Sequence, residues 1–151
     1  MQARPSVLDD SMVELQQRTR ALGSKCVLVV DDEHDPRELV TRVLERAGLK
    51  VIGVENVDEA FEVLDCEVVD LVVSDIGMPQ IDGIAFVRRM RAVPRWLSIP
   101  TIAVSGFAQP EDRQRALEAG FNAHFPKPFD SLTLLKAVIH LAAADRTSPE
   151  R

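Results

Sequence analysis

Features typical of membrane, secreted and redox-active proteins are missing from this chain of 151 residues. No apolar run approaches the roughly 20 residues that a membrane-spanning helix needs, and the first residues lead into polar sequence rather than a signal-peptide core. The two cysteines, Cys26 and Cys66, form no CxxC pair, so we interpret them as a small buried hydrophobic residue and an incidental thiol. We therefore expect a soluble, cytoplasmic protein with no membrane partner.

Positive charge is also in short supply. The chain has 18 Lys and Arg residues against 24 Asp and Glu residues, which gives a formal net charge of -6. Nucleic-acid binding needs clustered Lys and Arg to contact phosphates, so we expect no nucleic-acid partner. An acidic protein is better suited to binding cations or basic protein surfaces. The 46% hydrophobic content is enough for one domain with its own core.

Short apolar segments alternate with amphipathic ones along the chain. Such alternation predicts a parallel sheet with helical crossovers, because parallel neighbours need a long connection. The natural arrangement is a flavodoxin-like (βα)5 fold with strand order 2-1-3-4-5. We expect the domain at 25–143, preceded by a helical arm or linker at 1–24 and followed by a polar tail at 144–151. The expected strands are 26–30, 49–54, 71–75, 101–104 and 123–125.

Two local details accompany these elements. Asp35 followed by Pro36 predicts the N-cap and first residue of the first helix. Ile84, Val87 and Met90 are spaced for one buried helix face, which predicts that the neighbouring arginines at 88, 89 and 91 face outward.

Acidic residues follow two of the expected strands. Asp31 and Asp32 come directly after the first strand, and Asp75 ends the third. In the 2-1-3-4-5 order these two strands are neighbours, so the three carboxylates should meet at one sheet edge. Like charges about 4 Å apart repel by roughly 4 kcal/mol at an effective dielectric constant of 20, which favours a bound cation. All-oxygen ligands indicate Mg²⁺ or Mn²⁺.

Ser105 and Lys127 should reach the same edge from the fourth and fifth strands. A hydroxyl and an ammonium group are both suited to holding phosphate oxygens. An aspartate can act as a nucleophile and carry a phosphoryl group as an acyl phosphate. Taken singly, Ser105 is an ordinary turn residue and Lys127 a surface charge; together with the carboxylates they predict phosphoryl transfer onto Asp75.

These residues lie in four motifs that resemble those of the bacterial response-regulator receiver domain of two-component signalling. The motifs are Val29-Val30-Asp31-Asp32-Glu33, Ser74 through Gly83, Val104-Ser105-Gly106 and Lys127-Pro128-Phe129. They occur in the family's order, and the resemblance covers about residues 25 to 143.

The resemblance implies that Asp75 is phosphorylated by a histidine kinase or phosphotransfer protein, with Lys127 and Ser105 as the other catalytic residues. It implies that Asp31, Asp32, Asp75 and the backbone carbonyl of Gly77 bind Mg²⁺, and that the bond between Lys127 and Pro128 is cis. It implies self-phosphorylation and self-dephosphorylation rather than a separate enzymatic activity. Some members of the family form homodimers, which is a further option here.

The position of the switch residue departs from the family pattern. The resemblance places a Tyr or Phe switch residue, working with Ser105, where this chain has His124. We interpret His124 either as a pH-sensitive variant of the switch or as an ordinary polar surface histidine.

The chain ends a few residues past the last expected helix, so we expect output through contact with a downstream protein or through phosphate relay, in a stand-alone receiver or one excised from a hybrid kinase. Two alternatives stay open. One is a phosphatase with an aspartyl-phosphate intermediate, although Gly77 occupies the position where the haloacid dehalogenase type has a second acid. The other is a receiver-like scaffold that never accepts phosphate.

Overall fold

The computed structural model describes residues 25–77, 82–106 and 110–143, and the structural statements below concern these residues. The predicted N-terminal arm at 1–24 and polar tail at 144–151 lie outside them. Within the described ranges, no helix is long and apolar enough to cross a membrane.

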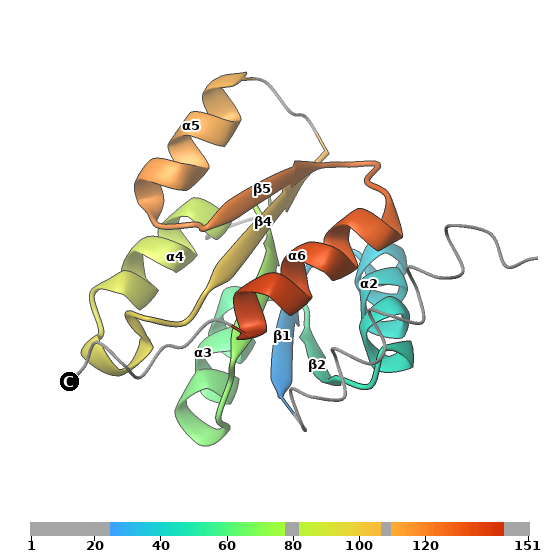
Figure 1. The fold of residues 1–151 in the computed structure, drawn as a ribbon. Coiled ribbons are helices and arrows are strands. Elements are labelled where there is room, and N and C mark those ends of the chain that lie inside the picture. Colours follow the sequence, from blue (N-terminus) through green and yellow to red (C-terminus); the bar gives the residue numbers. More distant parts are fainter. Residues whose placement is uncertain (1–24, 78–81, 107–109, 144–151) are drawn as a thin grey trace, which may run out of the picture.

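A five-stranded parallel sheet forms the centre of the fold (Figure 1). Its order is β2-β1-β3-β4-β5, and each neighbouring pair is parallel. This confirms the predicted flavodoxin-like order. The strands are β1 (Cys26–Val30), β2 (Lys50–Val54), β3 (Leu71–Asp75), β4 (Thr101–Ser105) and β5 (Ala123–Pro126).

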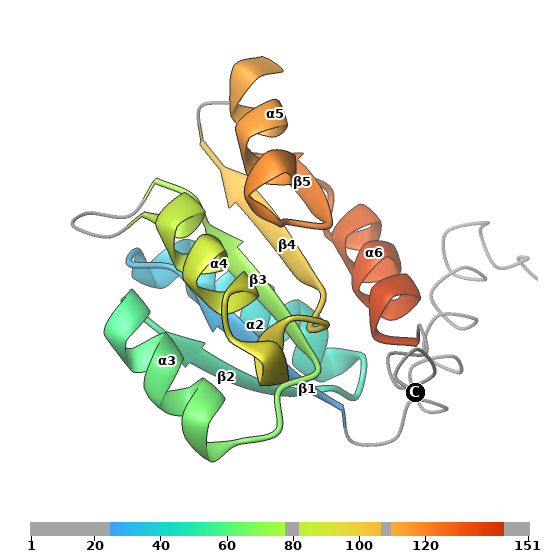
Figure 2. The same ribbon diagram turned by 90° about the vertical axis from the view of Figure 1, so that its left-hand side faces the viewer.

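Helices cover both faces of the sheet. On one face lie α2 (His34–Arg46) and α6 (Ser131–Ala143); on the other lie α3 (Val57–Cys66), α4 (Gly83–Arg91) and α5 (Pro110–Ala119), with a 3₁₀ turn, η1 (Pro94–Trp96) (Figure 2). Successive residues of a strand point to opposite faces. Accordingly Val27 packs with α2 and α6, whereas Leu28 packs with α3 and α4. Burial on both faces explains the continuous apolar runs of the central strands.

The start of α2 differs from the prediction. Glu33 is the N-cap residue and makes no side-chain cap hydrogen bond, and the helix begins at His34, so Asp35 is not the cap. The physical reason lies in the turn before the helix. The Asp31 carboxylate accepts the Glu33 N–H at 3.0 Å, which closes the turn early. In α3, by contrast, the N-cap residue Asn56 accepts the Glu59 N–H at 2.8 Å.

The predicted outward orientation of Arg91 is also wrong. Its half-buried guanidinium donates hydrogen bonds to the Gly120 carbonyl, the Leu97 carbonyl and the Thr101 hydroxyl at 2.9 Å each. Arg88 and Arg89 are exposed, as expected. Arg91 therefore connects the end of α4 to the segments that precede β4 and β5. Cys26 is buried in β1, which confirms its interpretation as a small buried hydrophobic residue, and Cys66 is exposed.

Candidate functional site

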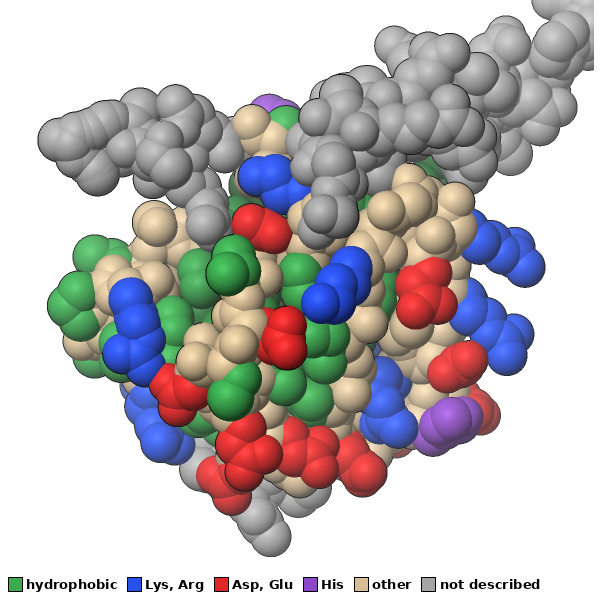
Figure 3. Space-filling view, turned by 90° about the horizontal axis from the view of Figure 1, so that it is seen from below, with side chains coloured by type: hydrophobic (Ala, Val, Ile, Leu, Met, Phe, Trp, Pro, Cys, Tyr) green, Lys and Arg blue, Asp and Glu red, His purple; other side chains and the backbone are tan. Residues whose placement is uncertain are grey.

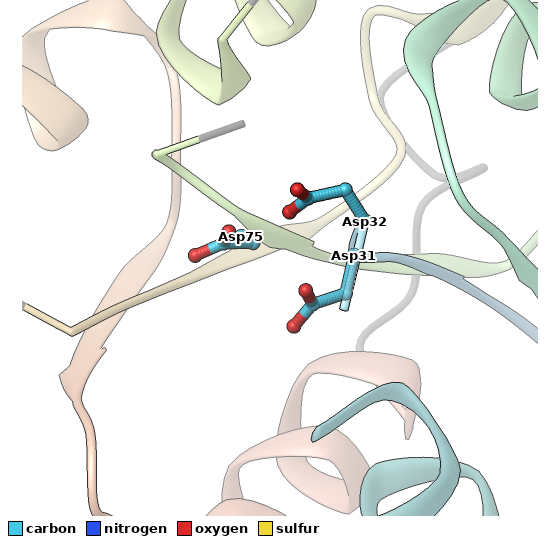
Figure 4. Close-up of side chains that lie close together, drawn as sticks. All are labelled: Asp31, Asp32 and Asp75. Atoms are coloured by element: carbon cyan, nitrogen blue, oxygen red, sulfur yellow. The ribbon is translucent and has the colours of Figure 1, made fainter. Parts of the chain in front are cut away.

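Three carboxylates meet at the carboxyl ends of β1 and β3. Val30 pairs with Ser74 in the parallel register, so the residues that follow them reach the same edge of the sheet. One oxygen each from Asp31, Asp32 and Asp75 can be chosen so that all three lie within 4.8 Å of one another. Figure 4 shows the three carboxylates directed to the same side of this edge. The structure thus brings together the acidic residues that the sequence singled out.

The environment of Asp75 disfavours its negative charge. Burial raises the pKa of Asp75 above its ordinary value, and the charges of Asp31 and Asp32 raise the pKa further. The Lys127 ammonium and a hydrogen bond from the Gly77 backbone act against this rise and lower the pKa. Asp31 and Asp75 are buried, whereas Asp32 is open to solvent. A cation that reaches the cluster from the solvent side would relieve the repulsion.

Lys127 places a positive charge between two of these carboxylates. Its Nζ lies 3.2 Å from Oδ2 of Asp31 and 3.6 Å from Oδ1 of Asp75. Its backbone N–H donates to the Ser105 carbonyl at 2.7 Å, which ties the end of β5 to the end of β4. The peptide bond between Lys127 and Pro128 is cis, as the resemblance implied.

Ser105 ends β4 one residue beyond Val104, which pairs with Asp75. Its side chain is buried, and its Oγ lies 2.9 Å from Nε2 of His124 on β5. His124 is half-buried. Burial and the positive charge of Arg113 lower the pKa of His124, whereas Asp112 raises the pKa. The two residues form one polar pair at the edge that holds the carboxylates.

The comparison with known proteins agrees with this geometry. Residues 27–139 match the family model of the response regulator receiver domain. The chain belongs to this family.

Two relatives are similar to this chain over most of its length. An uncharacterized 14.6 kDa protein from the sodA1 3′ region of Leptolyngbya boryana is 40% identical over 119 residues, which is 79% of this chain and 91% of that protein. Response regulator Rre1 of Synechocystis sp. is 36% identical over 125 residues, which is 82% of this chain. The matched region spans only 54% of Rre1.

A solved structure has the same fold. The signal receiver domain of a signal transduction histidine kinase from Syntrophus aciditrophicus superposes with a TM-score of 0.74 at 30% sequence identity. The match covers 85% of this chain and 94% of that one.

Two residues of this receiver domain hold the backbone beside the acidic cluster. Gly83 ends one of the motifs quoted above, whereas Arg37 was not singled out from the sequence. Nη1 of Arg37 donates to the Asp31 carbonyl at 2.7 Å, and the Cγ and Cδ atoms of Arg37 lie 3.4 Å from where a Cβ on Gly53 would be. The N–H of Gly83 donates to the Ile76 carbonyl at 2.9 Å. A Cβ on Gly83 would contact the Asp75 carbonyl and lie 2.9 Å from Cα of Ile76. Gly53 was the available signal, because a glycine in β2 leaves room for the long side chain of Arg37 on α2. Using this signal requires knowing which residues of β2 and α2 face each other.

A groove adjoins the carboxylates of the receiver domain. It encloses about 330 Å³ between α2 and the segment that follows β5, and its floor is largely apolar. Leu39 of α2, which lines it, is 52% exposed. The other lining residues are Asp31, Asp35, Pro36, Val40, Val104, Lys127, Pro128 and Phe129. An apolar surface therefore begins directly beside Asp31 and Lys127.

Proposed function

We propose that this receiver domain accepts a phosphoryl group on Asp75 and passes a signal on through the phosphorylated form. The observation that carries the proposal is the arrangement around Asp75. Its carboxylate lies 3.6 Å from the Lys127 ammonium and belongs to the cluster with Asp31 and Asp32. A nucleophilic carboxylate beside fixed positive charge is the arrangement that phosphoryl transfer requires.

The cluster fits a divalent cation. Its donors are carboxylate oxygens, which suit Mg²⁺ or Mn²⁺, and the like charges of Asp31 and Asp32 contribute to the raised pKa of Asp75. We propose that Asp31, Asp32, Asp75 and the Gly77 carbonyl would hold the ion. When bound, it supplies positive charge that neutralises and aligns the oxygens of the transferring group.

The transfer itself needs little covalent chemistry from the rest of the chain. An Asp75 carboxylate oxygen attacks the phosphorus, and an O–P bond forms as the bond from phosphorus to the donor breaks. For a phosphohistidine donor, the leaving group is the neutral imidazole once its nitrogen has taken up a proton. Lys127, already beside the attacking carboxylate, is placed to bind a phosphoryl oxygen, and the Ser105 hydroxyl is placed to bind another.

We propose a histidine kinase or a phosphotransfer protein as the donor. The groove beside Asp31 and Lys127 supports this, because a protein donor has to bring its phosphohistidine to the carboxylates while packing on a neighbouring surface. The exposed Leu39 offers an apolar anchor for such packing. A cytoplasmic location, which suits these donors, stays a prediction.

The signal has to come from several contacts acting together. Turning a 1:99 population into 99:1 requires about 5.5 kcal/mol of differential stabilisation. One hydrogen bond to a charged group contributes only about 1.5 to 3 kcal/mol. Ser105, Lys127 and the cation therefore have to act jointly, and the elements that they would repack are α5, β5 and α6. The resulting surface would bind a downstream protein or present the phosphoryl group to the next carrier.

Intact-mass measurement after incubation with Mg²⁺ and acetyl phosphate tests the proposal. We expect one phosphoryl adduct on the wild-type chain and none on Asp75→Asn or after chelation of the cation. A chain that gives no adduct would be a receiver-like scaffold. Steady hydrolysis of an added phosphoester, continuing without a protein donor, would instead support the phosphatase.

A further inference from the structure

Ser105, which is assigned to the phosphoryl site, is also hydrogen-bonded to a titratable ring, that of His124. His124 lies on β5 opposite Ala103, and its ring reaches along the strand pair to the buried Ser105 hydroxyl, with Nε2 2.9 Å from Oγ. The same hydroxyl is the one that the proposed function assigns to a phosphoryl oxygen. Two groups therefore compete for Ser105.

A serine hydroxyl has a single hydrogen to donate. When Nε2 of a neutral His124 accepts that hydrogen, Ser105 has none left for a phosphoryl oxygen. An imidazolium carries hydrogen on both ring nitrogens, so its Nε2 can only donate. Ser105 then accepts from His124 with a lone pair, and its own hydrogen is free to be donated elsewhere.

We propose that His124 is a positioning residue whose protonation reverses the direction of its hydrogen bond with Ser105, so that acid favours a phosphoryl group on Asp75. This inference rests on the proposed function. It adds a second input, proton concentration, to the same site.

The surroundings of His124 are compatible with this role. The elements that pack most closely on β5 are β4 and α5. Facing His124, β4 provides Ala103 and Ser105, while α5 contributes the charged residues Asp112 and Arg113. Burial and Arg113 lower the pKa of His124, whereas Asp112 raises it, and the net effect is a lowered pKa. The neutral ring is thus favoured without phosphate, and a new negative charge nearby would favour the imidazolium.

Histidine NMR titration with and without beryllofluoride, in the presence of Mg²⁺, measures the coupling directly. Binding and protonation are linked reciprocally, so an increase in the His124 pKa of about one unit on beryllofluoride binding corresponds to about tenfold tighter binding to the protonated form. His140, exposed on α6, is the internal reference and should not change. An unchanged His124 pKa in a chain that binds beryllofluoride would overturn the inference and leave the proposed function standing.

Ser105→Ala separates the hydrogen bond from simple charge attraction. In this variant the charge of the bound anion still acts on His124, but no hydroxyl mediates between them. We expect most of the pKa increase to be lost; a full increase in Ser105→Ala would contradict the proposed mechanism.

A second readout uses His124→Gln, whose amide does not titrate. The ratio of wild-type to variant beryllofluoride affinity cancels the titration of Asp75 itself. We expect this ratio to rise about tenfold between pH 8 and pH 5.5, and a constant ratio would count against the inference. The proposed function and this inference both fail if the wild-type chain binds no beryllofluoride, or binds it no more tightly than the Asp75→Asn variant does.

Discussion

At the scale of single residues, the surroundings of Asp75 disfavour its ionised form. The side chain is buried beside two like charges, with one lysine as compensation. Its raised pKa means that the folded chain holds the Asp75 proton more tightly than the unfolded chain does. By linkage, the stability that this group contributes is fully present below its unfolded pKa, about 3.9, and is lost as the pH rises through the folded pKa.

Removing that charge should stabilise the fold. We expect Asp75→Asn to raise the free energy of unfolding at pH 7 by about 1 kcal/mol without Mg²⁺, and the gain to shrink toward pH 4 as the wild-type carboxyl becomes protonated. Urea denaturation at several pH values measures this. Glu62→Gln, at an exposed position of α3, is the matched control and should have little effect. A gain of equal size at pH 4 would show that charge is not its cause.

At the scale of elements, the site depends on how closely α4 approaches the end of β3. The helix begins at Gly83, whose N–H donates to the Ile76 carbonyl, and the preceding Asp82 caps the helix by accepting the Ala85 N–H at 2.9 Å. There is no room for a side chain at Gly83, because a Cβ would contact the backbone of Asp75 and Ile76. At Gly77, in contrast, a Cβ would extend into open space, with no neighbouring group within 4 Å.

The two glycines therefore make a matched pair of variants. Gly83→Ala should lower the free energy of unfolding by roughly 1 to 3 kcal/mol, the usual range for overpacking, and weaken phosphorylation by displacing Asp75. Gly77→Ala should change the free energy by less than about 0.5 kcal/mol. Thermal unfolding and adduct formation measure both effects. Similar losses in the two variants would contradict the close approach seen at Gly83.

Arg91 has a purely structural role at the other end of the elements. Besides its bonds to Gly120, Leu97 and Thr101, its guanidinium donates to Trp96 and Asn122 at 3.3 and 3.2 Å. Because lysine cannot reproduce this planar set of donors, Arg91→Lys should lower the free energy of unfolding by roughly 2 kcal/mol. Arg88→Lys, at an exposed position of the same helix, should be neutral. Phosphorylation of the folded Arg91→Lys protein should be unchanged. Loss of phosphorylation in this variant would contradict a purely structural role for Arg91.

The sequence predicted the sheet and the acidic cluster because both depend on local patterns. Apolar runs too short for helices, each followed by an acid or a turn, are enough to place Asp31 and Asp75 at one edge once the strand order is assumed. The role of Arg91 was missed because it depends on the three-dimensional fold, which brings Gly120 and Asn122 from a distant segment to its guanidinium. The resemblance named Ser105 and His124 together as switch residues, but their direct hydrogen bond could not be predicted because it depends on the β4–β5 register. Asp35 was mistaken for the N-cap because the hydrogen bond from the Glu33 N–H to the Asp31 carboxylate was not foreseen. This bond closes the turn before Asp35 is reached.

At the scale of the whole molecule, the described surface is mixed in character. The face in Figure 3 carries both acidic and basic side chains, with hydrophobic ones between them. That face does not show the continuous basic surface that nucleic-acid phosphates require. The concentration of like charge lies instead at the carboxyl edge of the sheet, where Asp31, Asp32 and Asp75 meet. A cation bound there should stabilise the entire fold.

Mg²⁺ should accordingly raise the free energy of unfolding, by about 1.4 kcal/mol at ten times its dissociation constant. Asp32→Asn should weaken this stabilisation without disturbing the packing, since Asp32 is exposed. Asp35→Asn is the matched control, because Asp35 is also exposed and acidic but lies outside the cluster. Calorimetric unfolding at a series of Mg²⁺ concentrations measures the effect. Equal weakening in both variants would indicate diffuse charge screening rather than a specific site.

The identity of the phosphorylated residue tests the central claim most directly. Borohydride reduces an aspartyl phosphate to homoserine, so reduction after incubation with acetyl phosphate and Mg²⁺ marks the acceptor for peptide mass spectrometry. We expect homoserine at position 75, and only when Mg²⁺ is present. An unmodified Asp75, with the phosphoryl group on another residue or on none, would contradict it.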